Sequence, residues 1–224
     1  MIKKTKEKQY DILFKTEKKH GRTSFGIMAN ESWNQDPKRT LFTLSRYKFV
    51  AKLLEGKKEV LEIGCADAFG TRIVQQHVDK VTAIDFDPIF INDVESRMNP
   101  HWPMNVFLHD ILKSPIKKKF DSIFMLDVLE HIDKKLERKF LINSLFSLKK
   151  NGSMIIGILS LESQKYASPQ SKKGHVNCKS APDLKRLMEV FFSNVFIFSM
   201  NDEVVHTGFH KMANYIFALC ANRK

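Results

Sequence analysis

The sequence predicts an α/β fold, with a doubly wound, seven-stranded, mostly parallel sheet that ends in an antiparallel C-terminal hairpin. Three observations predict it. Short apolar runs rich in β-branched residues alternate with amphipathic helical segments from residue 38 onward. The first run leads into a turn of small residues and then into a helix. The last two runs follow each other without a helix between them, which favours an antiparallel pair at the sheet edge.

Each expected strand is a short apolar run bounded by turn residues. The seven runs occupy residues 60–63, 81–85, 106–108, 122–126, 154–159, 195–200 and 215–219. Asp36-Pro37 is typical of a helix start, and apolar residues then recur at helical spacing, which predicts a helix over residues 38–55. Further helices are expected over residues 69–77, from 87–88 onward, over 134–149 and over 182–192.

Three stretches predict irregular structure. Residues 24–33 contain glycine and asparagine and predict a loop, and Asn151-Gly152 predicts a turn before the fifth strand. The polar stretch from Glu162 to Ser180 is long for a simple connection, and loops of this length are commonly functional.

Length and charge indicate one domain with a basic N-terminal segment. The 224 residues fit a single domain over residues 23–224, with residues 23–56 as a helical lid. The net charge is +12, and residues 1–22 hold eight Lys/Arg against three acids. This segment is expected to be a solvated, mobile tail, or else to attract an anionic partner such as nucleic acid or a phosphate-bearing substrate.

The cysteines and the hydropathy pattern favour the cytoplasm. Cys65, Cys178 and Cys220 are odd in number and far apart, so they indicate no disulfide framework. The lysine-rich N-terminus lacks the apolar stretch of a secretory signal, and no apolar run is long enough to span a bilayer.

The segment from Val60 to Gly70 carries the chemistry. Its apolar strand runs into a turn of small residues, which lets a ligand approach the backbone, and the following helix offers free N–H groups. Asp85 ends the next strand, where an acid can bind ribose hydroxyls. A dinucleotide motif would need glycine where Phe69 stands, so a nicotinamide or flavin site is a poor match.

The segment resembles the first motif of the class I S-adenosylmethionine (SAM)-dependent methyltransferases. Glu62 and Gly64 match this motif, while Ala66 and Ala68 replace its later glycines, which alanine tolerates where φ is negative. Four further segments resemble later motifs of the family in the right order, namely residues 81–87, 109–111, 120–132 and 151–154. The resemblance covers roughly residues 38–220 and implies a Rossmann-like fold, SAM as cofactor and S-adenosylhomocysteine (SAH) as product.

The resemblance also implies which residues hold SAM. Glu62 lies near the amino group of its methionine part, Arg46 pairs with the carboxylate, Asp85 binds the ribose, and Asp110 takes the adenine amine. The implied cofactor-binding set is Arg46, Glu62, Gly64, Cys65, Ala66, Asp85, Phe86, Asp110, Ile111 and Leu126.

The acceptor side is expected to form from the loops at residues 165–177 and 204–210. The candidate general bases are His131, His175 and His206. Trp33, Asn177 and His210 are candidate substrate-binding residues. No metal is expected, because Glu130 and His131 lack further ligands at convincing spacing.

The sequence from Leu126 to His131 resembles the fourth motif of the small-molecule methyltransferases. It lacks the Asn/Asp-Pro-Pro-Tyr/Phe motif of enzymes that methylate base amino groups. The expected activity is O-methylation of a small polar or phosphate-bearing metabolite, such as a sugar, a sugar nucleotide or a surface-glycan intermediate. An RNA methyltransferase and a non-catalytic SAM-binding protein are the alternatives.

Overall fold

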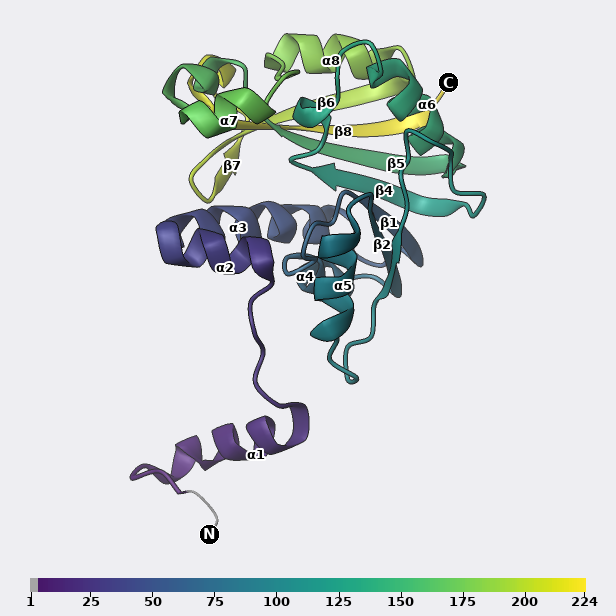
Figure 1. Ribbon diagram of the computed structural model, residues 1–224. Helices are drawn as coiled ribbons and strands as arrows, with labels where there is room; N and C mark the ends of the chain where they lie inside the picture. The colour runs from purple at the N-terminus through teal and green to yellow at the C-terminus, as the bar shows by residue number, and fades with distance from the viewer. Residues whose placement is uncertain (1–3) are drawn as a thin grey trace.

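The computed structural model describes residues 4–224 and contains one eight-stranded sheet (Figure 1). The strand order is β3-β2-β1-β4-β5-β8-β6-β7, and β8 runs antiparallel to both β5 and β6. The strands are β1 (Glu59–Ile63), β2 (Lys80–Asp85), β3 (Asn105–Leu108), β4 (Phe120–Leu126), β5 (Leu148–Leu159), β6 (Phe192–Asn201), β7 (Val204–His206) and β8 (Tyr215–Arg223). The predicted α/β sheet with antiparallel C-terminal strands is therefore confirmed.

The sheet has eight strands rather than the predicted seven. The added strand, β7, lies in a segment expected to be a loop, and it pairs antiparallel with β6 across a short turn at Asp202, where φ is +51°. With only three residues, β7 is too short to show a strand pattern in the sequence. β5 also begins earlier than predicted, so Asn151-Gly152 lies within the strand, and the register with β4 shifts there.

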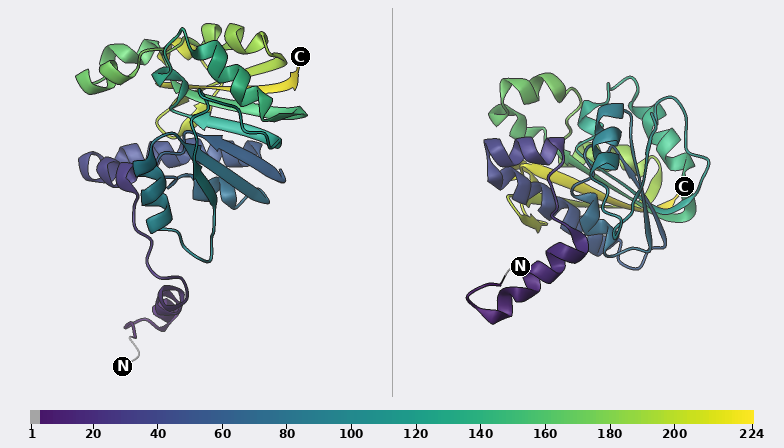
Figure 2. Two further views of the ribbon diagram at one scale, coloured as in Figure 1. Left: turned by 45° about the vertical axis from the view of Figure 1, so that its right-hand side comes forward. Right: turned by 60° about the horizontal axis from the view of Figure 1, so that its bottom comes forward.

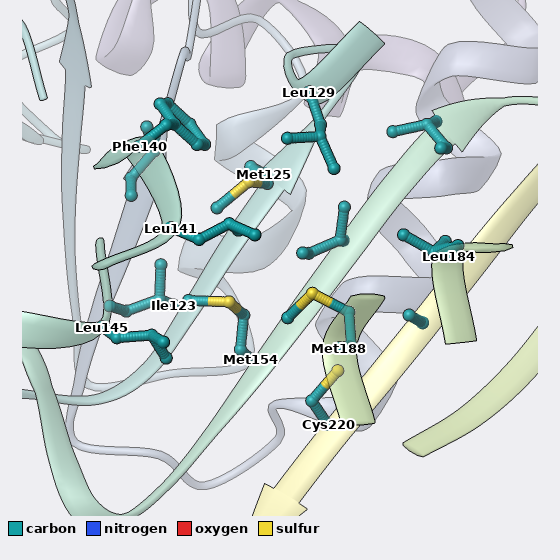
Figure 3. Close-up of a cluster of buried hydrophobic side chains, with 14 of the residues drawn as sticks. Ile123, Met125, Leu129, Phe140, Leu141, Leu145, Met154, Leu184, Met188 and Cys220 are labelled. Carbon is teal, nitrogen blue, oxygen red and sulfur yellow. The ribbon is translucent and has the colours of Figure 1, made fainter. Parts of the chain in front are cut away.

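Helices cover both faces of the sheet (Figures 1 and 2). α6 (Glu137–Phe146) and α8 (Ala181–Glu189) lie on one face. α3 (Pro37–Leu53), α4 (Thr71–Gln75) and α5 (Pro88–Ser96) lie on the other. Figure 3 shows the apolar cluster between the sheet and the first pair of helices. Burying apolar side chains on both faces is the main force that holds this fold together.

Two helices occur where the sequence predicted none. α2 (Ile27–Gln35) replaces the loop expected at residues 24–33, and α1 (Asp11–His20) follows a short 3-10 turn, η1 (Lys8–Tyr10), inside the basic segment. Neither α1 nor α2 has a fully buried side chain, so neither belongs to the apolar core. α1 stands away from the sheet in all views, and its end contacts the connection between α5 and β3, where Asn99 donates to the His20 carbonyl.

The long connection after β5 is ordered by short helices. It contains η3 (Glu162–Tyr166) and α7 (Pro169–Gly174). A further short helix, η4 (His210–Met212), lies between β7 and β8. Buried Lys179 ties the end of this connection to α6, because its Nζ lies 2.6 Å from Glu137 Oε2. Among residues 4–224, no helix combines the length and apolar character that crossing a membrane requires.

Candidate functional site

Five parallel strands end at one edge of the sheet, and the loops that follow them meet there. The strands β1, β2, β3, β4 and β5 end at Ile63, Asp85, Leu108, Leu126 and Leu159, and β8 begins at this edge because it runs the opposite way. Ligands of open α/β sheets bind outside the carboxyl ends of the strands. The residues that leave these ends therefore define the candidate site.

The loop after β1 approaches the loop after β4 closely at Gly64. Its φ is +75°, and a Cβ added there would lie 2.4 Å from Val128 Cγ2. Any side chain would thus clash as well as strain the backbone, so this position requires glycine.

Two alanines in the same loop adopt left-handed conformations. The φ angles are +45° at Ala66 and +51° at Ala68. The expectation that alanine stands here because φ is negative is therefore wrong. Ala66 N donates to Asp85 Oδ2 at 2.9 Å, so the carboxylate at the end of β2 helps to hold the strained turn.

Ala66→Gly is expected to stabilise the protein by roughly 0.5–1 kcal/mol, because relief of the left-handed strain exceeds the added chain entropy. Chemical denaturation would measure the free energy of unfolding. Ala51→Gly, inside helix α3, is the control and should destabilise the protein. A loss of stability in Ala66→Gly would show that the turn is not strained at this residue.

Glu62 lies beneath the loop and is almost completely buried, with 1% of its surface exposed. Tyr47 donates its hydroxyl to Oε1 at 2.7 Å, and Thr71 donates to Oε2 at 2.6 Å. Burial raises the pKa of Glu62 to about 7, although these two hydrogen bonds lower it. The carboxyl group of Glu62 therefore links the end of β1 to α3 and α4. It also holds a proton more readily than an exposed acid does.

The raised pKa of Glu62 predicts a fall in stability as pH rises. The folded protein retains the proton up to a pH of about 7, whereas the unfolded chain loses it near 4.5. The free energy of unfolding should therefore decrease as pH rises between these values. Thermal melts of wild type and Glu62→Gln should show a smaller decrease in the variant. Parallel curves would contradict the shift.

The loops after β2 and β3 hold the next group of predicted residues. Asp85 is 6% exposed, and its Oδ1 also accepts from Asp87 N at 3.0 Å. The side chain of Phe86 is open to solvent, with 72% exposed. Asp110 accepts from Leu112 N at 2.9 Å, and Ile111 beside it is buried. Phe86 and Asp110 thus offer an apolar surface and a carboxylate beyond the strand ends.

Arg46 comes from α3 but pairs with the loop after β4. Its Nη1 lies 3.0 and 2.8 Å from the two carboxylate oxygens of Asp127, and its guanidinium stacks 4.0 Å from the centre of the Tyr215 ring. Its Nε is buried and has no hydrogen-bond partner among the described residues. One edge of the guanidinium is therefore occupied, while the Nε edge remains able to donate.

Glu130, in the short helix η2 (Leu129–His131), is a second buried carboxyl at this edge. It has no exposed surface, and its Oε1 accepts from Leu159 N at 3.3 Å. Its Oε2 and the Tyr215 hydroxyl have no partner among residues 4–224. Burial, and then the neighbouring charge of Asp127, raise the pKa of Glu130.

His131 and His175 lie together, with ring centres 5.1 Å apart. Nδ1 of His131 lies 3.0 Å from the Gly174 carbonyl, and Nδ1 of His175 lies 3.1 Å from Gln164 Oε1. Both partners are acceptors, so each Nδ1 carries a hydrogen, and in the neutral ring the lone pair is then on Nε2. Burial and the nearby His131 lower the pKa of His175, which keeps its ring neutral near pH 7.

The other predicted acceptor residues make different contacts. His206 accepts from Gly208 N through Nδ1 at 3.0 Å and donates to Asn201 through Nε2 at 2.9 Å, so both its nitrogens stabilise the β6–β7 hairpin. Asn177 is buried and donates to Glu137 Oε2 at 2.7 Å. Trp33 is 49% exposed and packs on Phe25, and His210 lies in η4 before β8. The structure therefore brings together His131 and His175 but does not unite all the predicted residues.

Sequence patterns did not single out several residues that shape this site. Tyr47 and Thr71 hold Glu62, Asp127 and Tyr215 contact Arg46, and Asp67 accepts from Ala29 N at the start of α2. Asp127 lies within the motif from Leu126 to His131. Its backbone φ is +57°, a conformation that the sequence does not reveal. The described residues contain no group of three or more His, Cys, Asp or Glu arranged to hold a metal ion.

A family model described as a methyltransferase domain matches residues 36–191, which is more than two thirds of the chain. This chain belongs to that methyltransferase family. The match confirms the expected SAM-dependent methyltransferase with SAM as cofactor. Among curated proteins, the mitochondrial ubiquinone biosynthesis O-methyltransferase of Schizosaccharomyces pombe is 24% identical over 148 residues. That alignment covers 61% of this chain, and the chain spans 53% of that relative's length.

Solved structures share the fold of this methyltransferase. The N-methyltransferase NodS from Bradyrhizobium japonicum WM9, in complex with SAH, is 18% identical with a TM-score of 0.63 over 85% of this chain and 90% of that one. The plantazolicin methyltransferase BpumL, also in complex with SAH, is 15% identical with a TM-score of 0.65 over 87% of this chain and 94% of that one. At these identities the likeness shows the fold alone.

Proposed function

We propose that this methyltransferase transfers a methyl group from SAM to a hydroxyl of a small polar or phosphate-bearing acceptor. The observation that carries the proposal is the His131–His175 pair, which presents two Nε2 lone pairs at the carboxyl edge of the sheet. A hydroxyl acceptor must lose a proton as its oxygen is methylated, and a neutral histidine near pH 7 can take it.

The residues around the loops fit SAM. The unpartnered Nε edge of Arg46 suits the carboxylate of the methionine part, because a guanidinium can bind a carboxylate through two donors. Asp85 would bind the ribose, and exposed Phe86 would lie against the adenine. Gly64, Cys65 and Ala66 would line the backbone side, with Ile111 and Leu126 as buried apolar neighbours.

The protein mainly orients the reactants. When bound, SAM supplies an activated methyl group on a sulfonium. Transfer to a hydroxyl would leave the sulfonium electron pair on sulfur, and His175 Nε2 would accept the proton that the hydroxyl loses. Gln164 fixes the ring of His175 in the tautomer that leaves this nitrogen free. Alignment of donor and acceptor is expected to supply most of the acceleration.

One relative's name favours oxygen, and two lysines favour an anionic acceptor. The curated relative is named as an O-methyltransferase, although NodS is named as an N-methyltransferase, so the fold alone does not select the atom. Lys172 and Lys173, in α7 beside His175, would favour an anionic acceptor such as a sugar phosphate or sugar nucleotide.

The direct test is a mass-spectrometric screen of sugars, sugar nucleotides and other phosphate-bearing metabolites with the protein and SAM. A mass gain of one methyl group on a hydroxyl acceptor supports the proposal. Methylation confined to amines would overturn it. SAM binding without turnover on any acceptor would favour a non-catalytic protein. Activity lost in chelator and restored by magnesium would instead assign Glu130, His131 and His175 to a metal.

An RNA acceptor is the alternative, favoured by the positive charge of residues 1–22. Deletion of residues 1–22 should leave both turnover of a small acceptor and SAM affinity within about twofold, because only the end of α1 contacts the domain. Calorimetry and a methyl-transfer assay would measure this. If the deletion abolished RNA binding and turnover together, the RNA methyltransferase would become the better hypothesis.

A further inference from the structure

Positive charge gathers at the edge of the sheet opposite the methyl-transfer site. Lys117, Lys118 and Lys119 precede β4, and Lys149 and Lys150 open β5. Since β8 is antiparallel to β5, Arg223 at its end lies at the same edge, on the right-hand side of Figure 1 near the C-terminus. The cations therefore come from separate segments that the sheet topology assembles.

Several of these cations line a hollow with a volume of about 500 Å³. Its lining consists of Lys119, Leu148, Lys149, Lys150, Arg223 and Lys224. Lys149 pairs with Asp121 at 2.7 Å, but Lys119 and Lys150 have no acidic partner within residues 4–224. Arg223 donates to the Leu145 carbonyl at 2.8 Å, which fixes its position at the end of α6. The hollow thus holds more positive charge than its neighbours neutralise.

A second, smaller hollow adjoins the basic one. Its volume is about 150 Å³, and it shares Arg223 and Lys224 with the first, while its remaining lining is Ile142, Leu145, Val190 and Phe191. Ile142 and Val190 are 47% and 56% exposed, and nearby Phe146 is 46% exposed. Cations and exposed apolar side chains therefore stand side by side on one surface, which we call the basic-apolar face.

We propose that the basic-apolar face binds the surface of an anionic phospholipid bilayer. Its lysines would contact lipid phosphates, and Ile142, Phe146 and Val190 would enter the boundary between headgroups and acyl chains. A nucleic acid would match the charge but not the exposed apolar side chains of Ile142, Phe146 and Val190. Because the face lies opposite the carboxyl edge of the sheet, the bound protein would keep its methyl-transfer site directed away from the membrane.

Vesicle sedimentation tests the proposal with the full chain. Binding to vesicles that contain phosphatidylglycerol should exceed binding to pure phosphatidylcholine vesicles and should decrease with added salt. The double variant Lys119→Gln/Lys150→Gln should weaken this binding by about 25-fold, at about fivefold for each lysine near the surface. The matched control is Lys172→Gln/Lys173→Gln at the other edge of the sheet, which removes equal charge and should bind almost as wild type does.

A second pair of variants separates a bilayer from other polyanions. Ile142→Ser/Val190→Ser should weaken vesicle binding and leave binding to a polyuridine RNA unchanged. Melting curves would verify that each variant is folded. The proposal would be overturned if the two lysine double variants lost vesicle binding equally. It would also be overturned if deletion of residues 1–22 abolished vesicle binding while the substitutions in the basic-apolar face had no effect. Tight binding to RNA with none to anionic vesicles would assign the face to nucleic acid instead.

Discussion

Asp85→Ala is expected to remove most of the affinity for SAM while the domain stays folded. The carboxylate at the end of β2 would accept from ribose hydroxyls, and hydrogen bonds to a charged group contribute about 1.5–3 kcal/mol each. Loss of two such bonds predicts SAM binding weaker by roughly 100-fold or more. The same carboxylate also holds Ala66 N, so the variant loosens the loop that faces the cofactor.

Calorimetry with SAM and with SAH would measure this loss, and circular dichroism would verify the fold. Asp87→Ala is a matched control, because Asp87 is two residues away and caps α5 through Ile89 N. It should reduce stability slightly and leave SAM affinity nearly unchanged. Asp85→Asn keeps an acceptor for Ala66 N without the charge, so it separates the loop effect from the ribose contact. Undiminished binding by Asp85→Ala would remove Asp85 from the cofactor site.

The fold could be predicted from the sequence where apolar pattern and length were sufficient. The central parallel strands β1, β2 and β4 are rich in apolar residues because most of their side chains are buried, whereas β3 is only partly buried. β7 has three residues and lies at the sheet edge, so nothing in its sequence distinguishes it from a loop. α1 and α2 bury no side chain completely, whereas α3 buries Thr40, Tyr47, Val50 and Ala51.

The candidate site, like the fold, could be predicted from the sequence only in part. Positions fixed by local motif, such as Gly64 and Asp85, lie at the expected strand ends. Contacts between distant segments were beyond sequence reading, since Arg46 meets Asp127 across 81 positions in the chain. The left-handed backbone of Ala66 and Ala68 was also hidden, because the loop enforces a conformation that alanine alone disfavours.

His175→Ala is expected to lower turnover by roughly 100-fold to 10,000-fold, the range for loss of a general base. SAM affinity should change little, because His175 lies in the connection after β5 and none of its contacts involves the loop after β1. His206→Ala is the matched control. Both nitrogens of His206 are engaged within the β6–β7 hairpin, so its loss should leave turnover nearly unchanged.

The pH profile distinguishes a base from a structural role. The pKa of His175 lies below the usual value of 6.5, because burial and His131 disfavour its charge. A base must be unprotonated, so kcat should fall only as pH drops below that usual value, and this acid limb should disappear from the residual activity of His175→Ala. Gln164→Ala should lower kcat more than it changes KM, because the variant no longer determines which ring nitrogen of His175 carries the hydrogen. If turnover depended on His206 instead, the base would belong to the β6–β7 hairpin.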